Sequence, residues 1–158
     1  IMNVLRKVLV SSNQNTKITF LSTYSVYSPY EIFLDENSTI YLESDYANSK
    51  LEMEKNLISF TNSHKFSLMI LRIPVLLYKG VKTNFLGQLR NAIINNTTAK
   101  LSNPSSSLSL VFDVDHIVQL VKSDWKGFNL INCSSNPDIT FSDIGALAKE
   151  YGLTKPKE

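Results

Sequence analysis

A strand, a helix and a second strand follow one another in the first half of the sequence, and this order restricts the fold more than any other feature. Residues 17–22 (KITFLS) are rich in β-forming side chains and bounded by polar turn residues, which is typical of a buried strand. Apolar positions at helical spacing predict a helix over residues 45–60. A second buried strand is expected within residues 63–74, closed by Pro74. Strands joined by a helix are usually parallel, so the sequence predicts an α/β fold with a parallel sheet.

Further elements are expected before and after this unit. In the helix expected within 113–123, Asp113 is a plausible N-cap, and Ile117, Val118 and Val121 are predicted to face inward. His64 is predicted to be a solvated loop residue. The other expected elements are a helix near residues 5–9, a helix within 83–95, a loop with room for one short strand over 95–109, a strand within 127–132 and a helix over 142–152.

The composition argues against several classes of protein. With 158 residues, 43% of them hydrophobic, the chain can bury a core. A formal net charge of +2, with Lys and Arg scattered along the chain, gives no footprint for nucleic acid. The longest apolar run, residues 66–78, contains Arg72 and Pro74 and is too short to span a bilayer, and residues 1–10 lack the features of a signal peptide. We therefore expect no nucleic-acid partner, no membrane span and a cytoplasmic location.

Neither a disulfide nor a metal site is expected. Cys133 is the single cysteine, and we expect it to be a half-buried residue near a strand end. His64 and His116 lie far apart in the sequence without carboxylates at ligand spacing.

Tyr46 and Lys50 stand one helical turn apart at the start of the helix predicted over 45–60. Residues at positions i and i+4 share a helix face, so the Lys50 ammonium can favour the phenolate form of Tyr46 and make it a general acid or base. The same spacing is also explained by a tyrosine ring that packs on a lysine stem. The context is a hydroxyl cluster in the segment LSTYSVYS, which follows the first strand, where parallel sheets bind ligands. There Thr23 could hydrogen-bond the oxygen that Tyr46 protonates, or the hydroxyls could be ordinary turn residues.

The order of these segments resembles the extended short-chain dehydrogenase/reductase family, specifically the NAD-dependent epimerase/dehydratase branch that acts on nucleotide sugars. The matching pieces are a strand that ends in STYSVYS, the helix with YANSK, the strand that ends in LRIP, and FDVDHIVQLV. The resemblance implies that Tyr46 is the acid/base, that Lys50 holds the cofactor ribose and tunes Tyr46, and that Thr23 orients the substrate oxygen.

The resemblance also implies the surroundings of this catalytic set. Residues 1–75 would be the C-terminal half of an NAD(P)-binding Rossmann-like domain, and residues 76–158 a small substrate-binding region. The cofactor would be NAD or NADP, the substrate a nucleotide sugar or related small molecule, and the protein a homo-oligomer. The implied cofactor-binding residues are Ser22, Tyr46, Lys50, Arg72 and Pro74, and the implied substrate-binding residues are Thr23, Tyr24, Ser25, Val75, Asn84 and Arg90.

The chain departs from the family pattern in several places. Ser28 stands where the family has glycine, residues 75–79 replace its Asn and Val-Tyr-Gly-Pro, and residues 107–109 lack its diphosphate-binding arginine. The glycines, at 80, 87, 127, 145 and 152, form no glycine-rich phosphate loop. We therefore expect the chain to represent the second half of a larger protein, to bind NAD weakly or not at all by itself, and to leave a sheet edge exposed.

Two functions remain open at this stage. The first is an epimerase, dehydratase or reductase that acts on a sugar carbon with NAD(P), and the second is a non-catalytic binding or regulatory module with the same fold. All three catalytic positions are retained, which favours the enzyme.

Overall fold

The computed structural model describes residues 16–28, 34–76, 107–111, 114–133 and 135–140, together with the single residues 7, 91, 92, 95 and 97. The chain divides into two compact units. The first comprises Ile1–Ile73 and Val118–Cys133, and the second comprises Pro74–Ile117 and Ser134–Glu158.

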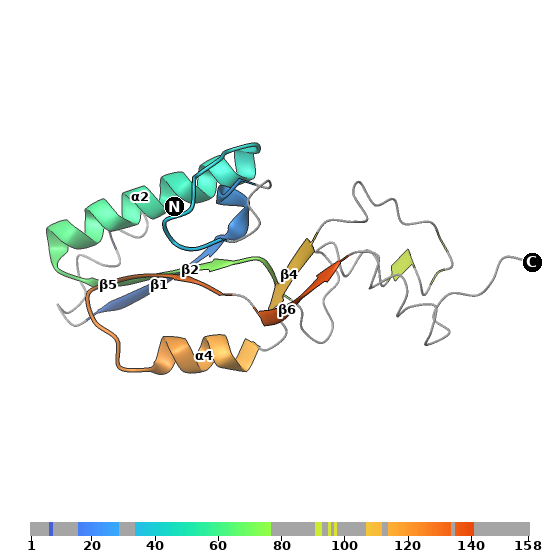
Figure 1. Ribbon diagram of the computed structural model, residues 1–158. Coiled ribbons are helices and arrows are strands. Elements are labelled where there is room, and N and C mark those ends of the chain that lie inside the picture. The colour runs from blue at the N-terminus through green and yellow to red at the C-terminus, as the bar shows by residue number, and fades with distance from the viewer. Residues whose placement is uncertain are drawn as a thin grey trace, which may run out of the picture. The chain divides into compact units, whose positions relative to one another are not determined.

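The first unit is built on a three-stranded parallel sheet with the strand order β1-β2-β5. Strand β1 (Lys17–Thr23) pairs with β2 (Ser67–Ile73), and β2 pairs with β5 (Phe128–Asn132). Helix α2 (Asp45–His64) covers one face of this sheet (Figure 1). The opposite face carries the Val118–Lys122 part of helix α4 (Val114–Lys122). The predicted strands and their parallel pairing are confirmed.

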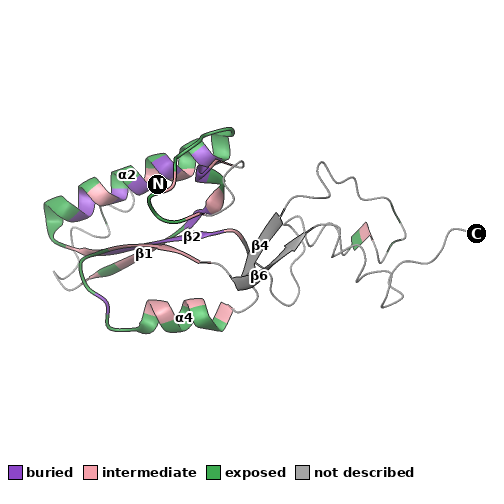
Figure 2. Cartoon of the chain, viewed as in Figure 1, coloured by how far each residue is buried: buried purple, intermediate pink, exposed green. Residues whose placement is uncertain are grey.

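Helix α2 forms where a capping residue precedes a run of good helix formers. The Ser44 side chain accepts a hydrogen bond from the Ala47 backbone N–H at 3.1 Å, and this satisfies one of the free amides of the first turn. The helix ends at His64, because Lys65 adopts the left-handed conformation with φ of 58°. One side of the helix is buried and the other is exposed (Figure 2).

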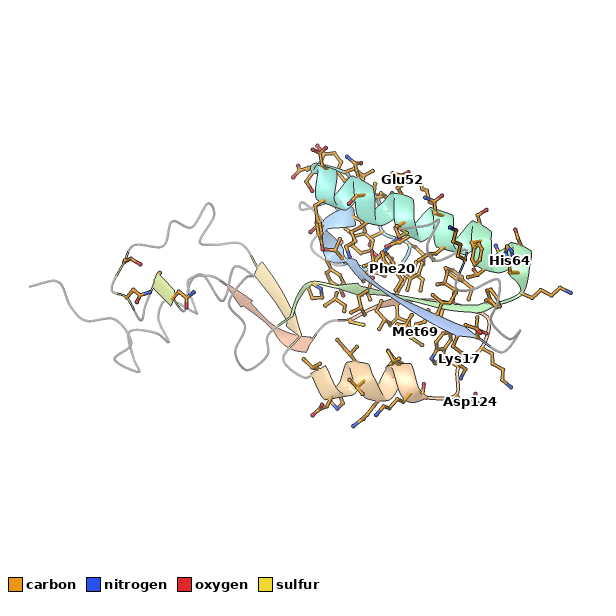
Figure 3. All side chains as sticks on the ribbon, turned by 180° about the vertical axis from the view of Figure 1, so that it is seen from behind. Lys17, Phe20, Glu52, His64, Met69 and Asp124 are labelled. Atoms are coloured by element: carbon orange, nitrogen blue, oxygen red, sulfur yellow. The ribbon has the colours of Figure 1, made fainter. Side chains whose placement is uncertain are left out.

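The core of the first unit lies between α2 and the sheet. Leu57 of α2 packs against Leu68 and Ile70 of β2, and all three side chains are at most 2% exposed. Phe20 of β1 lies in the same layer, whereas Glu52 projects from the outer face of α2 (Figure 3). Burial of side chains of this size stabilises the fold by about 1.5–3 kcal/mol each, so this layer anchors the helix on the sheet.

The second unit contains a separate sheet with the order β3-β4-β6. Strand β3 (Val75–Leu76) pairs in parallel with β4 (Ser107–Val111), and β4 pairs in antiparallel fashion with β6 (Ser135–Thr140). The short strand expected within residues 95–109 is therefore present as β4, which begins near the end of that stretch.

The structure contradicts the predictions made for His64 and Val118. His64 is exposed, as predicted, but it is the last residue of α2 and not a loop residue. Two contacts hold it in the helix. Its ring stacks on Phe60 at a centroid distance of 4.2 Å, and its Nδ1 lies 2.8 Å from the Phe60 carbonyl oxygen. Val118 does not face inward, since it is 39% exposed, and α4 has no buried residue among those described.

Several predictions fall on residues that the structure does not describe. The helix near residues 5–9 is represented by Lys7 alone, which is helical. Within 83–95 the structure describes residues 91 and 92, which are helical, and residue 95, which lies in a turn. The N-cap role of Asp113 and the helix over 142–152 lie outside the described residues. No described helix is long and apolar enough to cross a membrane.

Candidate active site

The carboxyl end of the first sheet carries a row of polar residues on the face that α2 covers. Ser22 of β1 lies beside Arg72 of β2, and Arg72 lies beside Asn132 of β5. In the preceding row on the same face, Phe20, Ile70 and Leu130 are apolar. The sheet therefore changes from an apolar row to a polar row at the edge where parallel sheets bind ligands.

Glu54 of α2 is the counterion of this row. Its carboxylate accepts hydrogen bonds from Arg72 Nε at 3.2 Å and Nη2 at 2.7 Å, and the Ser22 hydroxyl also donates to it. Glu54 is 2% exposed and Arg72 is 4% exposed. Burial by itself lowers the pKa of the Arg72 guanidinium, but hydrogen bonds to Glu54 and Tyr27, together with the charge of Glu54, raise this pKa above its ordinary value.

Tyr27 extends the network from Arg72 to β5. Arg72 Nη1 donates to the Tyr27 hydroxyl at 2.6 Å, and that hydroxyl donates to Asn132 Oδ1 at 2.8 Å. Arginine can only donate, so it fixes the direction of the chain of hydrogen bonds and leaves Asn132 Oδ1 as the final acceptor. The guanidinium also lies 4.8 Å from the centre of the Tyr27 ring. One continuous network thus joins α2 to the ends of all three strands.

Lys50 lies one turn before Glu54 on α2 and contacts the end of β1. Its ammonium nitrogen donates to the Leu21 carbonyl oxygen at 2.9 Å. The same nitrogen lies 5.1 Å from the centre of the Phe20 ring and 5.7 Å from the centre of the Tyr46 ring. The structure therefore brings the Lys50 charge beside the Tyr46 ring, as the helical spacing predicted. Tyr46 is 55% exposed and lies in the first turn of α2.

Thr23 ends β1 and caps the short 3-10 helix η1 (Tyr24–Val26). Its hydroxyl oxygen accepts a hydrogen bond from the Ser25 backbone N–H at 3.1 Å and donates to the Ser25 hydroxyl at 3.1 Å. Thr23 is buried, whereas Ser25 is exposed. The Tyr24 ring packs edge-on against Tyr27 at 5.9 Å. No hydrogen bond joins Thr23 to Tyr46 in the described part of the chain.

The remaining predicted site residues have different positions. Ser22 and Arg72 are buried in the network, and Pro74 is half-buried just after β2. Val75 begins β3. Asn84 and Arg90 lie outside the described residues.

Sequence reasoning missed the internal role of Glu54, Tyr27 and Asn132. A signal was present for Glu54, because this acidic residue falls on the buried stripe of α2 between Leu51 and Leu57. Arg72 interrupts the apolar run over residues 68–73 of β2. A charge in a buried element is stable only when it is paired, so this rule indicates that Glu54 and Arg72 each need a partner.

Cys133 is half-buried directly after β5, as predicted. Burial raises the pKa of its thiol, and the negative charge of Glu36 raises it further. Glu36 Oε1 also accepts a hydrogen bond from the Asn132 backbone N–H at 2.7 Å. A thiol of this kind is a weak nucleophile at neutral pH.

Comparison with protein families gives one match to the sequence. The model of the NAD dependent epimerase/dehydratase family matches residues 1–120. The chain belongs to this family. The match covers all of β1, α2 and β2, and so includes Thr23, Tyr46, Lys50, Glu54 and Arg72. Among curated proteins, nothing matches the sequence.

Solved structures of similar fold include several 4-epimerases of UDP-sugars. UDP-glucose 4-epimerase from Thermotoga maritima, solved with UDP-glucose, has a TM-score of 0.80 at 17% identity, over 98% of this chain and 53% of that one. RMD from Pseudomonas aeruginosa, complexed with NADPH, has a TM-score of 0.78 at 15% identity, over 99% and 56%. UDP-glucose 4-epimerase from Thermus thermophilus, in complex with NAD, has a TM-score of 0.71 at 18% identity, over 89% and 50%.

These similarities show the fold, a partial Rossmann-like α/β arrangement. The chain spans about half the length of the solved structures that it matches.

Proposed function

We propose that this chain carries the proton-transfer half of an NAD(P)-dependent nucleotide-sugar epimerase, dehydratase or reductase, with Thr23, Tyr46 and Lys50 as the catalytic set. The observation that carries the proposal is the position of the Lys50 ammonium. The ammonium donates a hydrogen bond to the Leu21 carbonyl oxygen at 2.9 Å, and Leu21 stands two residues before Thr23. The ammonium nitrogen also lies 5.7 Å from the centre of the Tyr46 ring. Membership of the epimerase/dehydratase family supports the same reading.

Each of the three residues has a distinct task. Tyr46 exchanges a proton with the reacting sugar oxygen, and its exposed ring is accessible to a substrate. Lys50 places its positive charge beside the Tyr46 ring, where it stabilises negative charge that develops on the phenol oxygen during proton transfer. Thr23 orients the sugar oxygen through its hydroxyl, which then exchanges its contact with Ser25 for one with the substrate.

The donors present fit a dinucleotide ribose. An ammonium group has three donors, and the Leu21 carbonyl takes one of those of Lys50, so the others can reach ribose hydroxyls. NAD(P), when bound, supplies hydride transfer at the sugar carbon. The Arg72 guanidinium donates to Glu54 and Tyr27. Its proposed contribution to cofactor binding is therefore to shape the edge of the sheet. The same contribution is proposed for Ser22 and Pro74.

The proposed substrate is a nucleotide sugar, the kind of molecule that relatives bind in their solved complexes. Tyr24, Ser25, Val75, Asn84 and Arg90 are the proposed contact residues, on the family resemblance alone. A homo-oligomer and a cytoplasmic location are proposed on the same ground.

Turnover of UDP-glucose with NAD by the native gene product tests this function. Tyr46→Phe is expected to lower kcat by about 10²–10⁴, the usual contribution of a general acid or base. Tyr41→Phe is the matched control, because Tyr41 is also exposed, at 46% against 55% for Tyr46, and lies outside the proposed catalytic set. Activity retained in Tyr46→Phe would remove this residue from the mechanism.

The alternative, a non-catalytic module with the same fold, is favoured by the altered segment 75–79. It predicts a stable protein partner and no change in melting temperature with NAD or UDP-glucose, which thermal shift measurements on the native gene product would detect.

A further inference from the structure

Helix α2 is attached to the end of β1 at two points that are one helical turn apart. Lys50 donates to the Leu21 carbonyl oxygen, and the next turn of the helix places Glu54 against Ser22. The two contacts therefore fall on consecutive residues of β1, immediately before Thr23.

The second contact is much more restrictive than apolar packing. Arg72 holds the Glu54 carboxylate through two donors, at 2.7 and 3.2 Å, in a geometry that fixes both distance and orientation. Leucine and phenylalanine side chains allow a helix to shift by small amounts, whereas a two-point ion pair in a buried site does not. Arg72 is itself held by Tyr27, which is hydrogen-bonded to Asn132 of β5.

Such a pair is poorly explained by stability alone. Desolvation of two charges offsets much of their attraction, and apolar residues of similar volume often serve equally well. A buried pair with this desolvation cost is better explained by the position that it imposes on α2. On this helix, Glu54 lies one turn from Lys50 and two turns from Tyr46.

We propose that Glu54 and Arg72 are positioning residues, which fix the rotation and register of α2 against β1 so that Tyr46 and Lys50 face Thr23. The inference rests on the proposed function for the meaning of that site, but its geometry can be tested without turnover. The Lys50 side chain is the reporter. Its ammonium lies over the Phe20 and Tyr46 rings, so their ring currents shift the Lys50 ε-methylene NMR signals upfield. Lys55, exposed on the same helix, is the internal reference.

The experiment compares lysine-labelled variants of this chain, with Lys50→Arg to assign the signal. Glu54→Gln removes the charge at constant size and is expected to move the Lys50 signal toward that of Lys55. Glu54→Met/Arg72→Met replaces both charges with apolar side chains, and is expected to recover most of the melting temperature lost in Glu54→Gln while the Lys50 signal stays displaced from its wild-type position. Arg72→Lys keeps the positive charge without the two-donor geometry. It is also expected to displace the Lys50 signal from its wild-type position.

Thr61→Val is the matched control. Thr61 is 3% exposed on α2, and within the described residues its hydroxyl bonds only to carbonyl oxygens of its own helix. This variant therefore changes a buried polar residue without touching the network. The Lys50 signal is expected to be unchanged in it. A wild-type Lys50 signal in the folded double variant, or in folded Arg72→Lys, would overturn the proposal.

These outcomes are separate from those of the turnover assay. If Tyr46→Phe retained activity while the Lys50 signal behaved as described, the catalytic assignment would fail and the positioning role would stand. If turnover depended on Tyr46 while the Lys50 signal ignored Glu54 and Arg72, the reverse would hold.

Discussion

Replacement of Tyr27 by phenylalanine should destabilise the first unit without altering its shape. The change removes one hydroxyl oxygen and keeps the ring, which is 3% exposed and packs against Val26 and Leu51. That hydroxyl accepts from Arg72 at 2.6 Å and donates to Asn132 at 2.8 Å. Both partners would then lack a bond at a site where water has little access.

The expected loss can be worked from these two bonds. A hydrogen bond to a charged group contributes about 1.5–3 kcal/mol and a neutral one about 0.5–1.5 kcal/mol, so Tyr27→Phe should cost about 2–4.5 kcal/mol. Domains are stable by about 5–15 kcal/mol, so this is a large fraction of the total. Tyr46→Phe is the matched control, because Tyr46 is exposed and its loss should cost less than about 0.5 kcal/mol.

Urea denaturation gives the measurement. Trp125 is the single tryptophan of the chain and is 8% exposed, so its fluorescence reports the unfolding of the first unit. The midpoint should fall in Tyr27→Phe with an unchanged slope, since the surface exposed on unfolding is the same. A loss below about 1 kcal/mol would refute the reasoning, because it would mean that the network contributes no more than an average neutral bond. An equal loss in Tyr46→Phe would refute it as well.

Three further predictions test the core, the cysteine and the cofactor. Leu57→Ala should cost about 2–5 kcal/mol in the same urea assay, because Leu57 is 2% exposed between α2 and the sheet. Alkylation of Cys133 by iodoacetamide should be slow at neutral pH and should accelerate only at a higher pH than for an ordinary thiol, since the raised pKa of Cys133 keeps the thiolate scarce. Glu36→Gln should speed the alkylation, and an unchanged rate would contradict the role of the Glu36 charge. Calorimetry with NAD should show weak binding or none to this chain alone, because no glycine-rich loop is present in it to approach the pyrophosphate, and tight binding would be the contrary result.

Most of the first sheet could be predicted because its elements have strong local patterns. The strand over 17–22 and the strand within 127–132 match β1 (Lys17–Thr23) and β5 (Phe128–Asn132), and the predicted start of α2 at Asp45 is confirmed. The end of α2 was placed one turn too early, at Phe60. Beyond that residue the helix is held by contacts of Thr61 and His64 with carbonyl oxygens of the preceding turn, which composition does not reveal.

The candidate site was predictable only where it depends on one helix. The approach of Lys50 to Tyr46 follows from the spacing of i and i+4, so it needed no knowledge of the tertiary structure. The prediction that Val118 faces inward is wrong, because an amphipathic pattern shows which residues share a helix face but not how completely other elements cover that face.

The sequence by itself determined the α/β architecture and the parallel crossover, because both follow from the order of strand, helix and strand along the chain. It also determined the helix face that carries Tyr46 and Lys50, because that face follows from the helical period. Only the tertiary structure decided that Glu54 and Arg72 pair, and that Tyr27 carries their network to Asn132, a residue 105 positions further along the chain. The physical reason is distance. A charge in a buried element must find a partner, but which partner it meets depends on strand order and register, which are properties of the folded sheet and not of any single segment.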